Sequence, residues 1–394
     1  MRIEEIKETN TDKKPVIVNS VNRWLPITMT WLYNLLVYQN EFKPIVIATE
    51  EINNTPFVWN PLYISSRNKF RHFLFKVLKK TKIKLVPFLY DTVIKEYKPC
   101  IIHSHFGNRG WYDLPIVRKY RLKHIVTFYG FDVNMLPMQD PVYKRRYKEL
   151  FDGVNLVLCE GQHMAKCIIN QGCPEQKIRV QQIGVEIDKI SFVPRKIENN
   201  GLIKILIAST FREKKGIPYA LEAVGILKEK YPNIRVTVIG DATDDKRDQK
   251  EKLKITDLIR RYKLYSIVNL LGFVPQHVLW KEAYKHHIFL SPSVTAVDGD
   301  TEGGAPISLI EMSASGMPIV STWHCDIPEV VKDGVTGRLV KERDINGLAG
   351  AIEDMVNKPE KWIEYGFSGR RRMETFYNVK NTVKRLEGIY KEIL

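Results

Sequence analysis

The sequence predicts an α/β protein built from two doubly wound domains, each with a parallel sheet. Short apolar runs such as Pro15–Ser20 and Ile203–Ala208 are typical of buried parallel strands, and each is followed by a loop and a helical pattern. A polar stretch, Pro194–Gly201, separates the two halves as a domain linker would. The 394 residues, 44% of them hydrophobic, suffice for two cores. We expect domains over residues 1–195 and 196–377.

The formal net charge of +16 favours a polyanionic partner. Residues 67–84 contain no acidic side chain, and their apolar residues recur at helical spacing. A basic amphipathic helix of this kind is typical of binding to an anionic membrane surface, but a helix packed on the core with a solvated basic face explains the pattern equally well. Because no zinc finger, helix-turn-helix or RNA-binding aromatic motif occurs, we expect no nucleic-acid partner.

The cysteines and the apolar runs indicate the compartment. The five cysteines are odd in number and form no C-x-x-C pair, which favours reduced thiols in a cytoplasm. The first residues are polar, and no run of about eighteen apolar residues occurs, so we expect neither a signal peptide nor a membrane span. We expect a cytoplasmic protein, peripheral to the inner face of the cell membrane.

The stretch Val297–Glu329 is expected to hold the chemistry. Its segment Gly303–Ala305 leaves backbone N–H groups exposed, and Pro306 stands where a helix would begin. A loop of small residues before a helix N-terminus favours an anion such as phosphate. We expect Glu311, one turn into this helix, to hold neutral hydroxyl groups such as those of a ribose. An ordinary surface residue of the helix is an equally good interpretation.

This segment resembles the donor site of the retaining, nucleotide-sugar-dependent glycosyltransferases of family four, in particular the branch that builds colanic-acid-like and other bacterial surface polysaccharides. The matching residues are Glu311, Ser315, Gly316, Pro318, Val320 and the loop Asp326–Glu329. The family pattern places another glutamate at the position that Gly303 occupies here, and Glu302 lies one residue earlier. We assign the role of that first glutamate to Glu302.

The resemblance also assigns residues in the first half. His-x-His-Phe-Gly is a family hallmark at the cleft between domains, with His105 nearest the sugars, whereas a metal-binding pair with His103 is the alternative. Family members often carry histidine where this chain has Tyr129, which can bond a hydroxyl but carries no proton near neutral pH. Gly130 and Asp132 match the family, and Asp132 is expected to orient an acceptor hydroxyl.

Two further segments belong to the predicted site. Thr30 is expected to cap a helix whose N-terminus faces the ligand crevice. In the basic loop after Ile203–Ala208, the family has arginine at Thr210 and lysine at Lys215 to grip the diphosphate, and Arg212 is our substitute for the missing arginine. Without the resemblance, a solvated loop is the simpler interpretation.

The resemblance implies a GT-B fold, in which two Rossmann-like domains face across a cleft and residues 378–394 form a C-terminal helix that packs back on the first domain. Cations and helix amides are expected to stabilise the leaving diphosphate, so no metal and no cofactor is expected. The acidic run Asp298–Asp300 is interpreted as shaping the loop. Retention is expected to follow attack on the face from which the diphosphate leaves.

We therefore expect a retaining, metal-independent hexosyltransferase that moves a sugar from a UDP- or GDP-sugar to a glycan or lipid-linked acceptor in surface polysaccharide synthesis. The alternatives are a sugar-nucleotide epimerase or phosphorylase of the same fold, and a non-catalytic partner that binds the nucleotide sugar. The expected catalytic residues are Glu302, Glu311 and His105. The expected donor-binding residues are Thr210, Arg212, Lys215, Phe273, Val274, Gly303, Gly304, Ala305, Pro306, Ile307 and Ser308, and the expected acceptor or cleft residues are Thr30, Tyr129, Gly130 and Asp132.

Overall fold

The structure, a computed structural model, describes residues 14–26, 29–52, 56–67, 88–197 and 201–394. The chain divides into two compact units. Unit 1 holds the described residues up to Thr127 with Gly153–Leu156 and Val383–Leu394, and unit 2 holds Phe128–Asp152 and Val157–Thr382. The domain limits expected at residues 195 and 377 stay predictions. Of the basic stretch 67–84, all but Arg67 lies outside the described residues.

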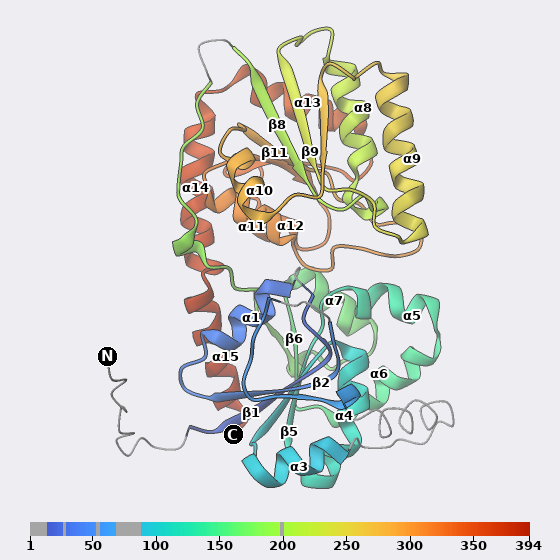
Figure 1. The fold of residues 1–394 in the computed structure, drawn as a ribbon, viewed down its shortest axis with the longest axis vertical. Coiled ribbons are helices and arrows are strands. Elements are labelled where there is room, and N and C mark those ends of the chain that lie inside the picture. The colour runs from blue at the N-terminus through green and yellow to red at the C-terminus, as the bar shows by residue number, and fades with distance from the viewer. Residues whose placement is uncertain (1–13, 27–28, 53–55, 68–87, 198–200) are drawn as a thin grey trace. The chain divides into compact units, whose positions relative to one another are not determined.

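The described residues form two parallel sheets (Figure 1). The strand order is β3-β2-β1-β4-β5-β6-β7 in the first sheet and β10-β9-β8-β11-β12-β13 in the second. The first sheet comprises β1 (Val16–Trp24), β2 (Lys43–Glu51), β3 (Leu62–Ile64), β4 (Ile101–His105), β5 (Lys123–Thr127), β6 (Leu156–Cys159) and β7 (Ile178–Val180). The second comprises β8 (Ile203–Ala208), β9 (Ile234–Ile239), β10 (Val268–Gly272), β11 (Ile288–Ser291), β12 (Ile319–Thr322) and β13 (Gly337–Val340).

Helices connect the strands, as parallel pairing requires. Those up to Asn170 are α1 (Thr30–Val37), α3 (Phe88–Tyr97), α4 (Gly107–Tyr120), α5 (Leu136–Gln139), α6 (Val142–Gly153) and α7 (Gln162–Asn170). Those that follow are α8 (Ile217–Leu227), α9 (Lys246–Arg261), α10 (Gln276–Ala283), α11 (Ile307–Ala314), α12 (Ile327–Val330), α13 (Ile345–Asn357), α14 (Lys361–Phe376) and α15 (Val379–Glu392).

The first sheet buries both of its faces in unit 1, because successive side chains of a strand point to opposite sides. On β2, Ile45 and Ile47 pack in a core that includes residues of α3 and α4. Val46 and Ala48 point the other way and pack in a core that includes residues of α1. Strands buried on both sides read as continuous apolar runs, which is how β2 appears in the sequence.

The C-terminal helix α15 contributes its last turns to unit 1. The Tyr390 hydroxyl is 2.7 Å from Nδ1 of His103 on β4, and the Glu387 carboxylate accepts hydrogen bonds of 2.7 Å from the amides of Asn40 and Glu41. These contacts place the end of the chain against the first sheet. The expected return of the C-terminal helix is therefore confirmed.

The second sheet is likewise covered on both faces (Figure 1). Ile205 on β8 and Val238 on β9 pack in a core with residues of α8, α9 and α13. Leu206 on β8 points the other way and packs in a core with residues of α11, α12 and α14. Odd-numbered residues of β8 therefore face α8 and α9, and even-numbered residues face the opposite layer.

The predicted α/β class with two parallel sheets is confirmed. The first strand is longer than the expected Pro15–Ser20, because Val21, Arg23 and Trp24 continue the parallel ladder with β2. No helix within the described ranges is both long enough and apolar enough to cross a membrane.

Candidate active site

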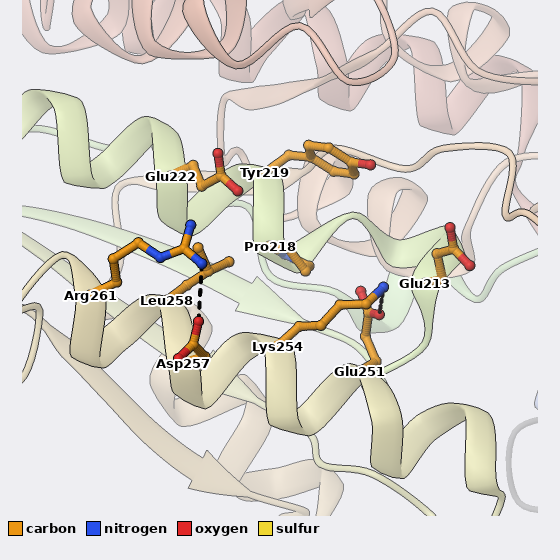
Figure 2. A pocket seen from close by; sticks show the side chains of 9 residues that line it. All are labelled: Glu213, Pro218, Tyr219, Glu222, Glu251, Lys254, Asp257, Leu258 and Arg261. Atoms are coloured by element: carbon orange, nitrogen blue, oxygen red, sulfur yellow. Dashed lines mark hydrogen bonds and ion pairs between the residues drawn. The ribbon is translucent and has the colours of Figure 1, made fainter.

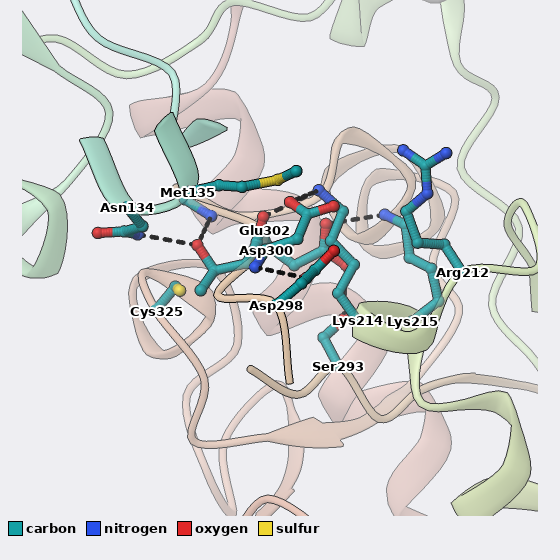
Figure 3. A network of polar contacts seen from close by, with 12 residues as sticks. Asn134, Met135, Arg212, Lys214, Lys215, Ser293, Asp298, Asp300, Glu302 and Cys325 are labelled. Carbon is teal, nitrogen blue, oxygen red and sulfur yellow. Dashed lines mark hydrogen bonds and ion pairs between the residues drawn. The ribbon is translucent and has the colours of Figure 1, made fainter. Parts of the chain in front are cut away.

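Glu302 lies in the loop between β11 and α11, and it is held there as an ionised carboxylate (Figure 3). Lys215 Nζ is 2.8 Å from its Oε2, and Ser293 Oγ donates to its Oε1 at 2.8 Å. Burial alone would raise the pKa of Glu302, but the charges of Lys215 and Lys214 and the two hydrogen bonds outweigh burial and lower the pKa to about 2. Glu302 therefore carries its charge throughout the physiological pH range.

Lys214, the neighbour of Lys215 in the chain, also contacts the loop that contains Glu302. Its Nζ is 3.0 Å from Asp300 Oδ1 and 2.9 Å from the Thr301 carbonyl oxygen. The Asp300 amide donates to Asp298 Oδ1 at 3.0 Å, and Asp298 also pairs with Arg247 at 3.0 Å. These contacts agree with the interpretation of the acidic run as shaping the loop.

Arg212 lies in a different environment from Lys215. Its Nε donates to Asp248 Oδ1 at 2.7 Å, and a second nitrogen is 3.3 Å from Asp245 Oδ2 at the start of α9. Figure 3 shows its guanidinium apart from the Lys215–Glu302 pair. Thr210 contributes a main-chain hydrogen bond, from the Arg212 amide to its carbonyl at 2.9 Å. The predicted pair of cations is thus not together: Lys215 contacts the loop before α11, and Arg212 contacts α9.

The glycines before α11 allow two chain segments to approach closely. Gly303 has φ +75° and Gly130 has φ +104°, and a Cβ added to either would lie 2.4 to 2.5 Å from the Cα of the other. A Cβ on Gly304 would lie 1.8 Å from Oε2 of Glu160. Only glycine fits at Gly130 and Gly303, because both the space and the backbone angles exclude a side chain, whereas at Gly304 the space next to the Glu160 side chain is the constraint.

The amides at the start of α11 are mostly unoccupied. The Gly303 amide donates to Thr301 Oγ1 at 3.1 Å. The amides of the next residues make no hydrogen bond to any residue that the structure describes, and Pro306 lacks an N–H group. These open amides belong to Gly304, Ala305, Ile307 and Ser308. Together with the helix dipole they favour a negatively charged group at this position.

Glu311, on α11, has a carboxyl group without a hydrogen-bond partner among the described residues. Burial raises its pKa to about 7. A group with this pKa is present both ionised and protonated near neutral pH. It can therefore accept a hydrogen bond from a ligand hydroxyl or donate one to it.

Phe273 and Val274, two of the predicted donor-binding residues, follow β10. Gly272 has φ +68°, Phe273 is 59% exposed, and Val274 packs against the core beneath α11. The segment lies at the carboxyl end of its strand, where ligands bind in open α/β sheets.

The residues predicted from the first half fall in both units. In unit 2, Asp132 is fully buried and accepts a hydrogen bond of 3.0 Å from the Tyr129 amide. In unit 1, Nε2 of His105 is 3.1 Å from Asn19 Oδ1, and burial lowers its pKa to about 3. Thr30 is the first residue of α1, and Met29 occupies the cap position without a side-chain hydrogen bond, so the expected cap by Thr30 is wrong.

His103 has a structural environment. Its Nδ1 is 2.7 Å from the Tyr390 hydroxyl and its Nε2 is 2.7 Å from Thr127 Oγ1, so both ring nitrogens are occupied. Its ring lies 4.3 Å from that of His105. Within the described ranges, no group of three or more His, Cys, Asp or Glu side chains is arranged to hold a metal ion.

Three side chains that contact the loop before α11 were not predicted from the sequence. Lys214 and Ser293 hold the loop, and Glu160 lies against Gly304. Burial raises the pKa of Glu160 well above its ordinary value, and the charges of Asp326, Asp132 and Glu302 add to the effect. Glu160 directly follows the last residue of β6, and the carboxyl end of a parallel strand is a position where sequence alone could have indicated it.

A hollow between α8 and α9 contains none of the predicted site residues (Figure 2). Its volume is about 250 Å³, and its two cations are already engaged: Lys254 pairs with Glu251 at 2.9 Å and Arg261 with Asp257 at 3.2 Å. The remaining carboxylates, Glu213 among them, leave its lining with an excess of negative charge. It is therefore unsuited to a diphosphate.

Comparison with known proteins identifies the family. The family model for glycosyl transferases group 1 matches residues 188–370, and that for glycosyltransferase family 4 matches residues 45–189. The amylovoran biosynthesis glycosyltransferase AmsK of Erwinia amylovora is 30% identical over 311 residues, which cover 78% of this chain and 74% of AmsK.

Solved structures share the fold. HepE of Anabaena in complex with UDP has a TM-score of 0.73 and 14% identity, covering 95% of this chain and 99% of HepE. The lipopolysaccharide outer core galactosyltransferase WaaB has a TM-score of 0.70 and 16% identity, covering 96% of this chain and all of WaaB, 100%. The predicted family and GT-B fold are confirmed. The chain belongs to the family 4 (group 1) glycosyltransferases.

Proposed function

We propose that this glycosyltransferase is a retaining hexosyltransferase that takes its sugar from a UDP- or GDP-sugar. The observation that carries the proposal is the row of open amides at the start of α11, beside the loop in which Lys215 holds Glu302 ionised. A diphosphate would accept hydrogen bonds from these amides and would be stabilised by the helix dipole. The donor sugar would then lie near Glu302.

The nucleoside would extend from the diphosphate towards Glu311 and the turn after β10. The open carboxyl of Glu311, with its pKa of about 7, would bind ribose hydroxyls. The main chain at Phe273 and Val274 would meet the base. HepE was solved in complex with UDP, which supports UDP as the first nucleotide to test for this chain.

The ionised, hydrogen-bonded state of Glu302 favours attack by the acceptor on the face of the donor sugar from which the diphosphate leaves. Both carboxylate oxygens accept hydrogen bonds, from Lys215 and Ser293, which stabilise the charge and weaken the group as a nucleophile. The leaving phosphate would take the acceptor's proton, because His105, with a pKa of about 3, is a weak base. Glu302 would position donor hydroxyls and stabilise positive charge that develops at the anomeric carbon.

We further propose that the reaction needs no metal and no cofactor. The negative charge of the leaving diphosphate would be met by the amides of α11 and by Lys215, if the lysine turns from Glu302 to the phosphate. Arg212 would join them by leaving Asp245, a pair in which both side chains are about a third exposed and which is therefore weak.

The acceptor is proposed to be a glycan or a lipid-linked glycan of a bacterial surface polysaccharide. The names of AmsK and WaaB, amylovoran biosynthesis and lipopolysaccharide outer core, support this class. The net charge of +16 supports a cytoplasmic location at the anionic inner face of the membrane, with residues 67–84 as the proposed contact.

Turnover measurements test the proposal. Purified protein is incubated with UDP- and GDP-sugars, with and without a glycan acceptor, and release of the nucleoside diphosphate is measured. We expect release only with the acceptor, a product of retained configuration, and no loss of rate in EDTA. An altered sugar nucleotide without acceptor would indicate an epimerase, phosphate-dependent release would indicate a phosphorylase, and binding without turnover would indicate a non-catalytic partner.

A substitution at Glu311 tests the site assignment in the same assay. Glu311→Gln is expected to weaken donor binding roughly tenfold, because one charge-assisted hydrogen bond to ribose is lost. Glu364→Gln, an exposed glutamate on α14, is the matched control and is expected to behave as the wild type. Equal donor affinity in the two variants would overturn the assignment.

A further inference from the structure

A second cavity lies on the second sheet, at the ends of the strands that are opposite to the donor loops. Its volume is about 390 Å³. It is lined by the first half of β8, by β9 as far as Thr237, by the start of β10 with the segment before it, and by the end of α10 with the segment after it. None of the residues predicted for the donor site lines this cavity.

A row of neighbouring side chains forms the floor of the cavity. These side chains lie on the face of the second sheet that α11 and α12 cover nearer the carboxyl ends of the strands. Lys204 on β8 is the register partner of Arg235 on β9, and Thr237 is the partner of Asn269 on β10. Neighbouring strands lie about 4.8 Å apart, so these side chains stand close enough to contact a single small ligand.

Positive charge predominates in the lining. Lys204, Arg235 and Lys285 are its cations, and Glu282, 2.7 Å from Lys285 Nζ, is its one carboxylate. The Arg235 guanidinium donates from one nitrogen to main-chain oxygens at 2.7 and 2.8 Å and forms no ion pair with any described residue. The lining thus has two positive charges in excess of its negative charge.

The environments of a histidine in the lining, His286, and of an arginine behind it, Arg195, also indicate a positive electrostatic potential in the cavity. Burial lowers the pKa of His286; Glu282 raises it, and the charges of Lys204 and Lys285 lower it further. Behind this wall, Arg195 is 3% exposed, and its guanidinium bonds to carbonyl oxygens, including that of His286 at 2.8 Å, and to one serine hydroxyl, but to no carboxylate of a residue that the structure describes. A buried cation without a counter-charge strengthens the attraction for an anion in the cavity.

Two neutral polar groups in the lining have no partner. Thr237 is 9% exposed, and its hydroxyl makes no hydrogen bond to any residue that the structure describes. The side-chain amide of Asn269, which is exposed to solvent, also makes no hydrogen bond to a described residue. The Thr237 hydroxyl lines the cavity and is available to a ligand atom there. Tyr265, 71% exposed, adds an aromatic ring at the rim.

We propose that this cavity is a second binding site, which takes a phosphate ester whose phosphate group contacts Lys204, Arg235 and Thr237. Guanidinium and ammonium groups together with a hydroxyl suit the oxygens of a phosphate. The ring of Tyr265 offers a surface on which the remainder of the ligand packs. The acidic hollow between α8 and α9 lacks this chemistry, since each of its cations is paired with a carboxylate.

The site is independent of the donor site in position. Lys204 and Arg235 are the second residues of β8 and β9, whereas the loops after these strands begin beyond Ala208 and Ile239, about 13 Å further along at about 3.3 Å per residue. A ligand in the cavity therefore does not compete with the nucleotide, and the two events are separable by experiment.

Calorimetric titration of the full chain in saturating UDP tests the proposal. The probes are glucose 1-phosphate, inorganic phosphate and vesicles of phosphatidic acid, which distinguish a soluble ester, a free anion and a lipid headgroup. We expect a phosphate probe to bind with UDP present and with roughly tenfold lower affinity in Arg235→Gln. Thr237→Val is expected to weaken it several-fold.

Arg260→Gln, an exposed arginine of α9 outside the cavity, is the matched control and is expected to bind as the wild type. A vesicle response that depends on Arg235, without binding of the soluble probes, identifies the ester as a lipid headgroup. Failure of all three probes to bind, equal binding by Arg235→Gln and Arg260→Gln, or displacement of the probe by UDP would each overturn the proposal. Thermal unfolding of the variants checks that they remain folded.

Discussion

Replacing Lys215 by methionine is expected to destabilise unit 2, because it leaves the carboxylate of Glu302 buried without its cation. The side chains of Glu302 and Lys215 are 5% and 19% exposed, so solvent screens their attraction only weakly. The pKa of Glu302 falls from an ordinary 4.5 to about 2, a difference of about 2.5 units. At 1.36 kcal/mol per unit this is about 3 kcal/mol of stabilisation.

The pH dependence follows from the direction of this shift. Because the folded pKa lies below the unfolded one, the stabilisation is complete above pH 4.5 and is lost as the pH falls towards 2. Lys214 and Ser293 share in this shift, so Lys215→Met is expected to lower the free energy of unfolding by up to about 3 kcal/mol at pH 7 and by much less near pH 2.5. Urea unfolding followed by tryptophan fluorescence at the two pH values measures this difference.

A double-mutant cycle isolates the pair. Lys215→Met combined with Glu302→Gln removes both charges, so the double variant is expected to be more stable than the sum of the single losses predicts, by up to about 3 kcal/mol. Lys361→Met, an exposed lysine at the start of α14, is the control. A coupling energy below about 0.5 kcal/mol, or equal losses at both pH values, would refute the reasoning.

Three further changes have expected outcomes. Donor affinity is expected to rise with pH through about 7, as Glu311 ionises and becomes a better acceptor for hydroxyls, and Glu311→Gln is expected to remove this dependence in calorimetric titrations. Gly130→Ala is expected to abolish donor binding and to lower the melting temperature by several degrees, because its Cβ would lie 2.5 Å from the Cα of Gly303. Tyr390→Phe is expected to cost about 1–2 kcal/mol in urea unfolding, because it leaves a buried nitrogen of His103 unpartnered. Unchanged pH dependence, an unchanged melting temperature, or unchanged stability would contradict these three expectations in turn.

Features that depend on local sequence could be predicted. The strand β8 and the start of α11 follow from an apolar run and from glycines before a proline, signals that lie within a few residues of each other. The end of β1 could not be placed, because Val21, Arg23 and Trp24 become strand only by pairing with β2, about 27 residues away in the chain.

The contacts between side chains were harder to predict than the strands and helices. Lys214 and Lys215 are adjacent and look alike in sequence, yet one binds Asp300 and the other Glu302, and both partners lie more than 80 residues away. Arg212 is engaged by Asp248, a partner that no local pattern indicates. Such pairings depend on how distant loops meet, which the sequence of one chain does not encode in any short motif.

The central claim is that the open amides at the start of α11 receive the diphosphate of a nucleotide sugar, and amide NMR tests it most directly. UDP is titrated into protein labelled with ¹⁵N and ²H. The account predicts large shifts at Gly304, Ala305, Ile307 and Ser308, saturating with the same affinity that calorimetry gives, and loss of these shifts in Lys215→Met. UDP binding that leaves these four amide resonances unmoved would contradict the account.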